Sequence, residues 1–194
     1  MGSYNTLSGD YLNVTLGSGF KHSNTAARWY PGGSPSTSGL TNLATNTCYA
    51  YPWWVPEAIT VAEIGVNVSS AGAASALVRF AVWNDNGSFY PGTLALNGGA
   101  DVDVTATGAK SSSPAVALAG GQLYWFGLLT NGSIGAAFQC YQVPGGRPPV
   151  SYIPSTSLTN GFEGWVISNG SFTLGSFPAN AVPGPAPFVK YRVS

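Results

Sequence analysis

Glycine and proline are spread along the whole chain, and this excludes long helices. The 194 residues include 26 Gly and 14 Pro, which disfavour a helix interior by about 1 and 3 kcal/mol relative to Ala. In the longest stretch without either residue, 73–86, the apolar residues Val78, Phe80 and Val82 fall on alternate positions. A period of two predicts a half-buried strand.

The rest of the chain has the same organisation of short apolar segments separated by turns. Sequences such as NDNGS, TNGS and SNGS contain Asn and Gly, which adopt a positive φ at little cost. The sequence therefore predicts an all-β fold, an antiparallel β-sandwich of the jelly-roll-like kind. The expected strands are residues 10–16, 47–55, 59–68, 77–83, 93–97, 100–106, 115–118, 122–130, 136–143, 162–167, 171–174 and 188–194.

Two of these segments have informative patterns. Residues 122–130, QLYWFGLLT, are apolar on both faces, which is typical of a strand buried on both sides. This segment is either the central strand of the sandwich or a strand at a subunit contact. Near the C-terminus, Val189, Tyr191 and Val193 alternate with Lys190 and Arg192, which predicts a strand with one face in the core and one in water.

The composition divides the chain into two parts. Residues 1–45 are rich in Ser, Thr, Asn and Gly, with PGGSPSTSG at 31–39, which indicates an extended N-terminal arm or docking segment. Residues 46–194 hold most of the expected strands. We therefore expect the sandwich domain to span 46–194.

The chain carries very little charge. It has seven Lys or Arg and seven Asp or Glu, 7% of its residues, and a net charge of zero, whereas about 25% is usual. A surface of this kind has little charge repulsion, so we expect copies of the chain or other partners to cover part of it. The basic residues are scattered singly, which argues against nucleic acid. There is no apolar run long enough for membrane insertion and no recognisable signal sequence.

The residues needed for catalysis or metal binding are sparse. The only histidine, His22, has no nucleophile or acid beside it in the sequence. Asp101 and Asp103 lie two apart on one strand face, a spacing that could serve glycoside hydrolysis or calcium binding, but the alternating valines already explain a strand with a solvated face. Cys48 and Cys140 are expected to be buried thiols, although their pairing stays open. We expect no enzyme activity, no cofactor and no metal.

The tryptophans are the best candidates for binding. In YPWWVP, Pro52 and Pro56 restrict the strand to an edge or a bulge, because proline lacks a backbone donor. Trp53 and Trp54 must point to opposite faces, so one lies in the core and the other is free to meet a neighbouring subunit, a loop or a glycan. Trp83, on the opposite face from Phe80, is expected to be the most exposed candidate. These three residues are the predicted contacts for a glycan or partner.

About half of the chain resembles a known type of virion module. The segments ARWYPGG, TNLATNTCYAYPWWVPEAITVAEIGVNV, VRFAVWNDNGSFYPGTLALNGGADVDVTATG and LAGGQLYWFGLLTNG, between residues 27 and 132, resemble a β-sandwich module of tailed-bacteriophage virion proteins. Such modules occur in tail-fibre, receptor-binding and surface-decoration proteins. They have no catalytic residues that could be transferred to this chain.

The resemblance implies a structural virion protein that is assembled in the host cytoplasm and displayed on the tail or capsid. It also implies self-assembly as a homotrimer, docking on other virion proteins through the N-terminal arm, and contact with host-surface glycans. A monomeric, non-catalytic carbohydrate-binding module is the alternative, because the same kinds of strand and exposed aromatic ring occur there.

Overall fold

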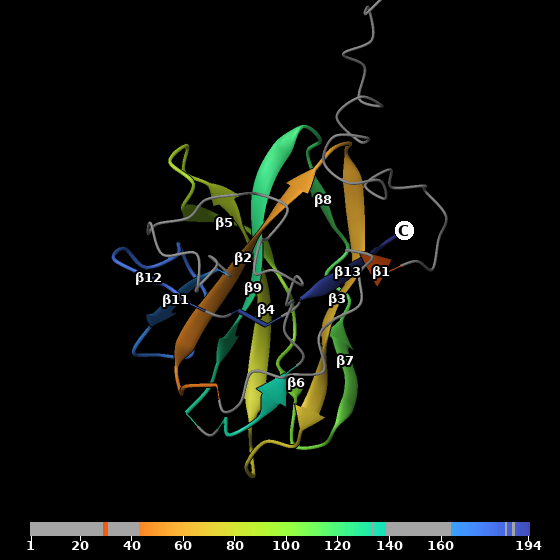
Figure 1. The fold of residues 1–194 in the computed structure, drawn as a ribbon. Coiled ribbons are helices and arrows are strands. Elements are labelled where there is room, and N and C mark those ends of the chain that lie inside the picture. The colour runs from red at the N-terminus through yellow and green to blue at the C-terminus, as the bar shows by residue number, and fades with distance from the viewer. Residues whose placement is uncertain (1–28, 31–42, 133, 139–163, 185, 188) are drawn as a thin grey trace, which may run out of the picture.

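The computed structural model describes residues 29–30, 43–132, 134–138, 164–184, 186–187 and 189–194 (Figure 1). In that part of the chain there is no helix, and the strands form two antiparallel sheets. The expected all-β antiparallel sandwich is confirmed. The expected strand at 10–16, His22 and Cys140 lie outside the described residues.

The first sheet, sheet A, is built around the long strand β3. Its order is β1-β13-β3-β10, and β7 and β8 also pair with β3. The strands of sheet A are β1 (Trp29–Tyr30), β3 (Ile59–Ser70), β7 (Gly108–Ser112), β8 (Val116–Leu118), β10 (Ala137–Phe138) and β13 (Lys190–Val193).

The second sheet, sheet B, has the order β12-β11-β2-β9-β4-β5, with β6 also paired to β4. Its strands are β2 (Thr47–Val55), β4 (Leu77–Asp85), β5 (Pro91–Asn97), β6 (Val102–Asp103), β9 (Gln122–Thr130), β11 (Trp165–Ser168) and β12 (Val182–Pro183). In Figure 1 the two sheets form two layers, with β2, β9 and β4 in one and β3, β7 and β13 in the other.

Strand β9 is the central strand of sheet B, as one of the two expectations for 122–130 stated. It pairs with β2 on one side and with β4 on the other, and seven consecutive residues from Tyr124 to Thr130 are buried. Tyr124, Phe126 and Leu128 join the core between the sheets, whereas Trp125 and Leu129 join a second cluster on the outer face. Both faces of this strand are therefore covered by the protein's own side chains.

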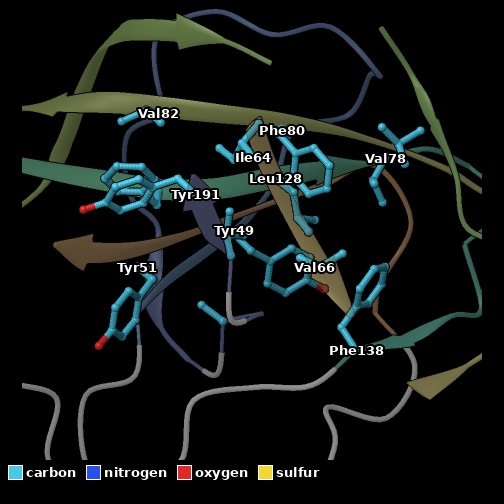
Figure 2. Packing of buried hydrophobic residues seen from close by; sticks show 14 of the residues in the cluster. Tyr49, Tyr51, Ile64, Val66, Val78, Phe80, Val82, Leu128, Phe138 and Tyr191 are labelled. Carbon is cyan, nitrogen blue, oxygen red and sulfur yellow. The ribbon is translucent and has the colours of Figure 1, made fainter. Parts of the chain in front are cut away.

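The main core lies between the two sheets. Side chains of Phe80 from β4, Ile64 from β3 and Tyr191 from β13 meet in this layer (Figure 2). The rings of Tyr191 and Phe126 stack with centroids 4.8 Å apart. Strand β13 follows its expected pattern, since Val189, Tyr191 and Val193 are buried while Lys190 and Arg192 are half-buried.

Residues 171–174, SFTL, were expected to form a strand, and this expectation is wrong. The amide Nδ2 of Asn169 donates to the carbonyl oxygens of Ser171 and Thr173, both at 3.0 Å. Since a side chain satisfies these carbonyls, the segment needs no strand partner. Phe172 and Leu174 instead pack against the outer cluster of sheet B.

Parts of the expected N-terminal arm lie against the sandwich. Strand β1 pairs with β13, with Trp29 opposite Arg192. Leu43 belongs to the main core, and its amide nitrogen donates to the carbonyl oxygen of Ala136 at 3.3 Å. The docking role of residues 1–45 stays a prediction, because most of that segment lies outside the described residues.

Candidate functional site

Trp53 is the inward member of the tryptophan pair on β2. Its side chain is buried in the main core, and its indole Nε1 donates a hydrogen bond to the hydroxyl of Tyr191 at 3.0 Å. This bond joins sheet B to sheet A across the core, because Tyr191 lies on β13. Trp53 therefore has a structural role.

Trp54 points to the opposite side and is half-buried. It lies opposite Leu123 on β9. The second neighbour of β2, strand β11, pairs only with Thr47 to Ala50, so in the described part of the chain the half of β2 that holds Pro52 and Trp54 is a sheet edge. This agrees with the edge position that the prolines predicted, and it leaves Trp54 as the outward candidate of the pair.

Trp83 was expected to be the most exposed of the three candidates, and this expectation is wrong. Only 1% of its surface is exposed. Its ring meets that of Phe177 edge to face at 5.0 Å, and its Nε1 donates to the carbonyl oxygen of Gly175 at 2.9 Å. A segment almost 100 residues later in the sequence covers Trp83, and the local pattern around β4 contains no sign of it.

The covering segment is anchored by aromatic side chains on the outer face of sheet B. The hydroxyl of Tyr90 donates to the carbonyl oxygen of Pro178 at 2.6 Å and accepts from the amide nitrogen of Ala181 at 2.8 Å. Tyr90 also packs against Trp165, with ring centroids 4.9 Å apart. This face is therefore a second core layer beneath residues 172–181, which leaves less of its aromatic surface for a ligand.

Asp85 organises the turn between β4 and β5. Its Oδ1 accepts from Nε1 of Trp125 at 2.9 Å, and its Oδ2 accepts from the amide nitrogen of Gly87 at 2.8 Å. Phe89, held at a φ of 55°, then packs edge to face on Trp125 with centroids 5.0 Å apart. The carboxylate fixes the hairpin over the ring of Trp125.

Asp101 and Asp103, the acidic pair of the sequence, have separate structural partners. Both oxygens of Asp101 bind the guanidinium of Arg79, with Nη2 to Oδ2 at 3.2 Å, and Arg79 also caps the carbonyl oxygen of Phe172 at 2.7 Å. Asp103 accepts from the amide nitrogen of Thr105 at 2.7 Å, and this hydrogen bond lowers the pKa of Asp103. Asp101 therefore stabilises the fold through an ion pair, and Asp103 stabilises a turn.

A row of side chains on the outer face of sheet A was not predicted from the sequence. Trp29, Arg192 and Glu63 lie directly opposite one another on β1, β13 and β3. Arg192 binds Glu63 through two contacts, Nε to Oε2 at 3.0 Å and Nη2 to Oε1 at 2.9 Å. Trp29 has 38% of its surface exposed. The alternation of β13 predicted the outward position of Arg192. Strand β1 could not be predicted, because two residues are too few to show an apolar pattern.

Cys48 is a free, buried thiol on the outer side of sheet B, as expected for this cysteine. Burial raises its pKa to about 12, from 9.0 in water. The protonated thiol is therefore favoured by folding. This contribution to stability is fully present below about pH 9 and is lost as the pH rises toward 12.

Between pH 8 and about pH 11, we expect the free energy of unfolding to fall less in a Cys48→Ala variant than in the parent chain. In the parent, the thiol ionises in the unfolded state before it ionises in the folded state, whereas alanine does not ionise. Urea unfolding followed by far-UV circular dichroism measures this, with Cys140→Ala in both proteins so that only Cys48 differs. Tyr49 contributes a pH dependence of its own in both, since burial also raises its pKa. Equal losses in the two proteins would contradict the assignment of the effect to Cys48.

Within the described residues, no group of three or more His, Cys, Asp or Glu side chains is arranged to hold a metal ion. That same part of the chain has no helix able to cross a membrane. No protein-family model matches the chain, and no curated protein matches it either.

Proposed function

We propose that this chain is a non-catalytic structural protein of a bacteriophage particle, displayed on the tail or capsid, that self-associates as a trimer and contacts host-surface glycans. The proposal rests on the resemblance of residues 27–132 to virion β-sandwich modules and on the physical properties of the surface. Docking on other virion proteins is assigned to the N-terminal arm, residues 1–45.

The observation that carries the self-association is the scarcity of free charge on the folded surface. Arg79 is neutralised by Asp101 and Arg192 by Glu63, and Asp85 is used inside the turn. The other charged side chains in the described part of the chain are Glu57, Asp103, Lys110 and Lys190, of which Lys190 also makes an interaction within the protein. Such a surface associates readily, because few charges must lose water at an interface.

The structural use of the acidic side chains supports a non-catalytic role. A general acid or base needs a carboxyl group that can exchange a proton with a substrate. Asp85 and Asp101 are instead engaged by donors of the protein on both oxygens, and Glu63 is held by Arg192. These hydrogen bonds and ion pairs stabilise the fold and occupy the carboxylate oxygens of these three residues.

Trp54 is the side chain best placed for a subunit contact on sheet B. It is half-buried, lies at the edge half of β2 and is not part of the aromatic cluster beneath residues 172–181. A large apolar ring at a sheet edge gains stability when a second molecule covers it. Its assigned partner is another copy of the chain.

A monomeric carbohydrate-binding module is the second candidate. The exposed ring of Trp29 beside the fixed Arg192 and Glu63 pair favours it, since such surfaces also occur on proteins that bind sugars without assembling. The two candidates differ in oligomeric state.

Mass measurement by light scattering coupled to size exclusion tests the proposal. We expect the purified full chain to elute at about three times its 19.9 kDa, and to keep that mass in about 1 M NaCl because contacts without ion pairs are not screened. Imaging the intact particle with this chain located in it would then give its position. A mass of one chain at every concentration would contradict self-assembly and support the monomeric module.

A further inference from the structure

Trp29 differs from most tryptophans of this chain in how its ring is used. Trp53, Trp83, Trp125 and Trp165 each donate their indole N–H to another group of the protein. In the part of the chain that the structure describes, Trp29 makes no such bond, and 38% of its surface is exposed. An exposed indole offers both an apolar face and a hydrogen-bond donor.

The neighbours of Trp29 are polar groups held in fixed positions. Two of the five N–H groups of the Arg192 guanidinium bind the two oxygens of Glu63. The remaining donors of Arg192 and the second lone pairs of the Glu63 oxygens stay available to a ligand, since both side chains are only about 70% buried, at 31% and 26% exposure. Because the pair is already ordered, binding to it costs little side-chain entropy.

The next row on the same face consists of Lys190, Gly65 and Ser111. Gly65, two residues from Glu63 on β3, is buried between these neighbours. A Cβ at Gly65 would lie 2.5 Å from the carbonyl oxygen of Lys110 and 2.9 Å from Cβ of Ser111, so only glycine fits there. The amide of Asn67, two residues further along β3, is half-buried on the same side.

We propose that this outer face of sheet A, formed by Trp29, Arg192 and Glu63, is a binding surface for a neutral saccharide. A sugar ring has one apolar face and a rim of hydroxyls that both donate and accept hydrogen bonds. The ring of Trp29 can stack on the apolar face of the sugar, and the paired guanidinium and carboxylate can donate to and accept from its hydroxyls. The proposal deepens the proposed function, since it assigns the glycan contact to residues outside the YPWWVP segment.

The charge of the row formed by Trp29, Arg192 and Glu63 indicates which class of saccharide it fits. Arg192 and Glu63 neutralise each other, so this row has no net charge to attract an anionic or cationic polymer over a distance. Lys190, which lies opposite Gly65 on the same face, is half-buried and makes an interaction of its own. Binding then depends on ring stacking and on hydrogen bonds with fixed directions. These favour an uncharged sugar over a phosphate-rich or sulfated one.

Affinity gel electrophoresis of the full chain tests the proposal, with dextran, mannan, laminarin and galactomannan as the neutral probes. We expect at least one of them to retard the protein, and Trp29→Ala to weaken that retardation at least about tenfold in dissociation constant, equal to about 1.4 kcal/mol. Trp29→Phe should keep part of the affinity. Arg192→Lys should lose most of it, because an ammonium cannot hold both carboxylate oxygens in a plane.

The control is Val182→Ala, which removes part of an apolar side chain that is 62% exposed on β12 of the other sheet and should leave retardation unchanged. Equal melting temperatures for the parent, Trp29→Ala and Val182→Ala would exclude unfolding as the cause. Absence of retardation by all four polysaccharides, or retardation lost in Val182→Ala and kept in Trp29→Ala, would overturn the proposal. Loss of oligomer mass in Trp29→Ala would also overturn it, by making this face a contact between copies. A trimer without retardation would overturn this glycan surface and leave the proposed self-assembly standing.

Discussion

Replacing Trp53 by Ala should lower the free energy of unfolding by about 3–5 kcal/mol, the usual cost of removing a large aromatic side chain from a core. Trp53 is 5% exposed and its indole is bonded to the hydroxyl of Tyr191 across the two sheets. The variant therefore leaves a cavity and loses a contact that ties β2 to β13. Since small domains are stable by only about 5–15 kcal/mol, much of the molecule should be unfolded at moderate urea concentration. Urea titration followed by far-UV circular dichroism measures the change.

Trp54→Ala is the matched control, because the two residues are adjacent on the same strand. We expect it to cost much less stability, since Trp54 is only half-buried and belongs neither to the main core nor to the outer cluster of sheet B. We expect it to reduce the mass of the oligomer instead. Trp53→Phe separates packing from hydrogen bonding, with an expected cost of about 0.5–1.5 kcal/mol for the lost bond. Equal and mild losses for Trp53→Ala and Trp54→Ala would contradict the assignment of inner and outer roles.

The strands with strong apolar alternation could be predicted from the sequence, in some cases to the residue. Strands β2 and β9 have the bounds that were expected for 47–55 and 122–130. Their apolar content and the turns around them leave few alternatives, because a helix is excluded by the glycines and prolines. The inward and outward faces of β13 were predicted for the same reason.

Strands whose pairing depends on a distant segment could not be predicted. Strand β7, GAKSS, has no apolar alternation and is held as a strand by β3, with Ser111 opposite Gly65. The two-residue strand β1 exists only because β13 offers it an edge. The local pattern of apolar residues does not depend on partners that lie tens of residues away or more in the sequence, so it gave no indication of either strand.

The burial of the outer face of sheet B could not be predicted from the sequence either, because it also depends on a distant segment. On β4, Arg79, Ala81 and Trp83 alternate with the core residues and therefore looked like a solvated face. Residues 172–181 cover that face, and the hydroxyl of Tyr90 holds them through Pro178. Side-chain periodicity reports which positions share a face, but it does not report whether a loop later returns to cover that face.

Gly127 is the position on β9 where we expect the largest effect of a single added methyl group. It lies between Ala50 of β2 and Ala81 of β4, and a Cβ there would overlap the carbonyl oxygen of Tyr49. The obstacle is backbone in the centre of the sheet, so it cannot move aside as a flexible side chain would. We expect Gly127→Ala to cost at least about 3 kcal/mol, measured as a shift of the urea midpoint.

Gly175→Ala is the matched control for this substitution. A Cβ at Gly175 would have nothing within 4 Å, so the same chemical change should alter the free energy of unfolding by less than about 0.5 kcal/mol. The comparison tests the register of the central sheet, because a shift of β9 by one residue would place Gly127 on the other face and remove the overlap with Tyr49. A mild effect at Gly127 would therefore mean that β2 and β9 are paired differently, and with them the assignment of Trp53 to the core and Trp54 to the surface would change.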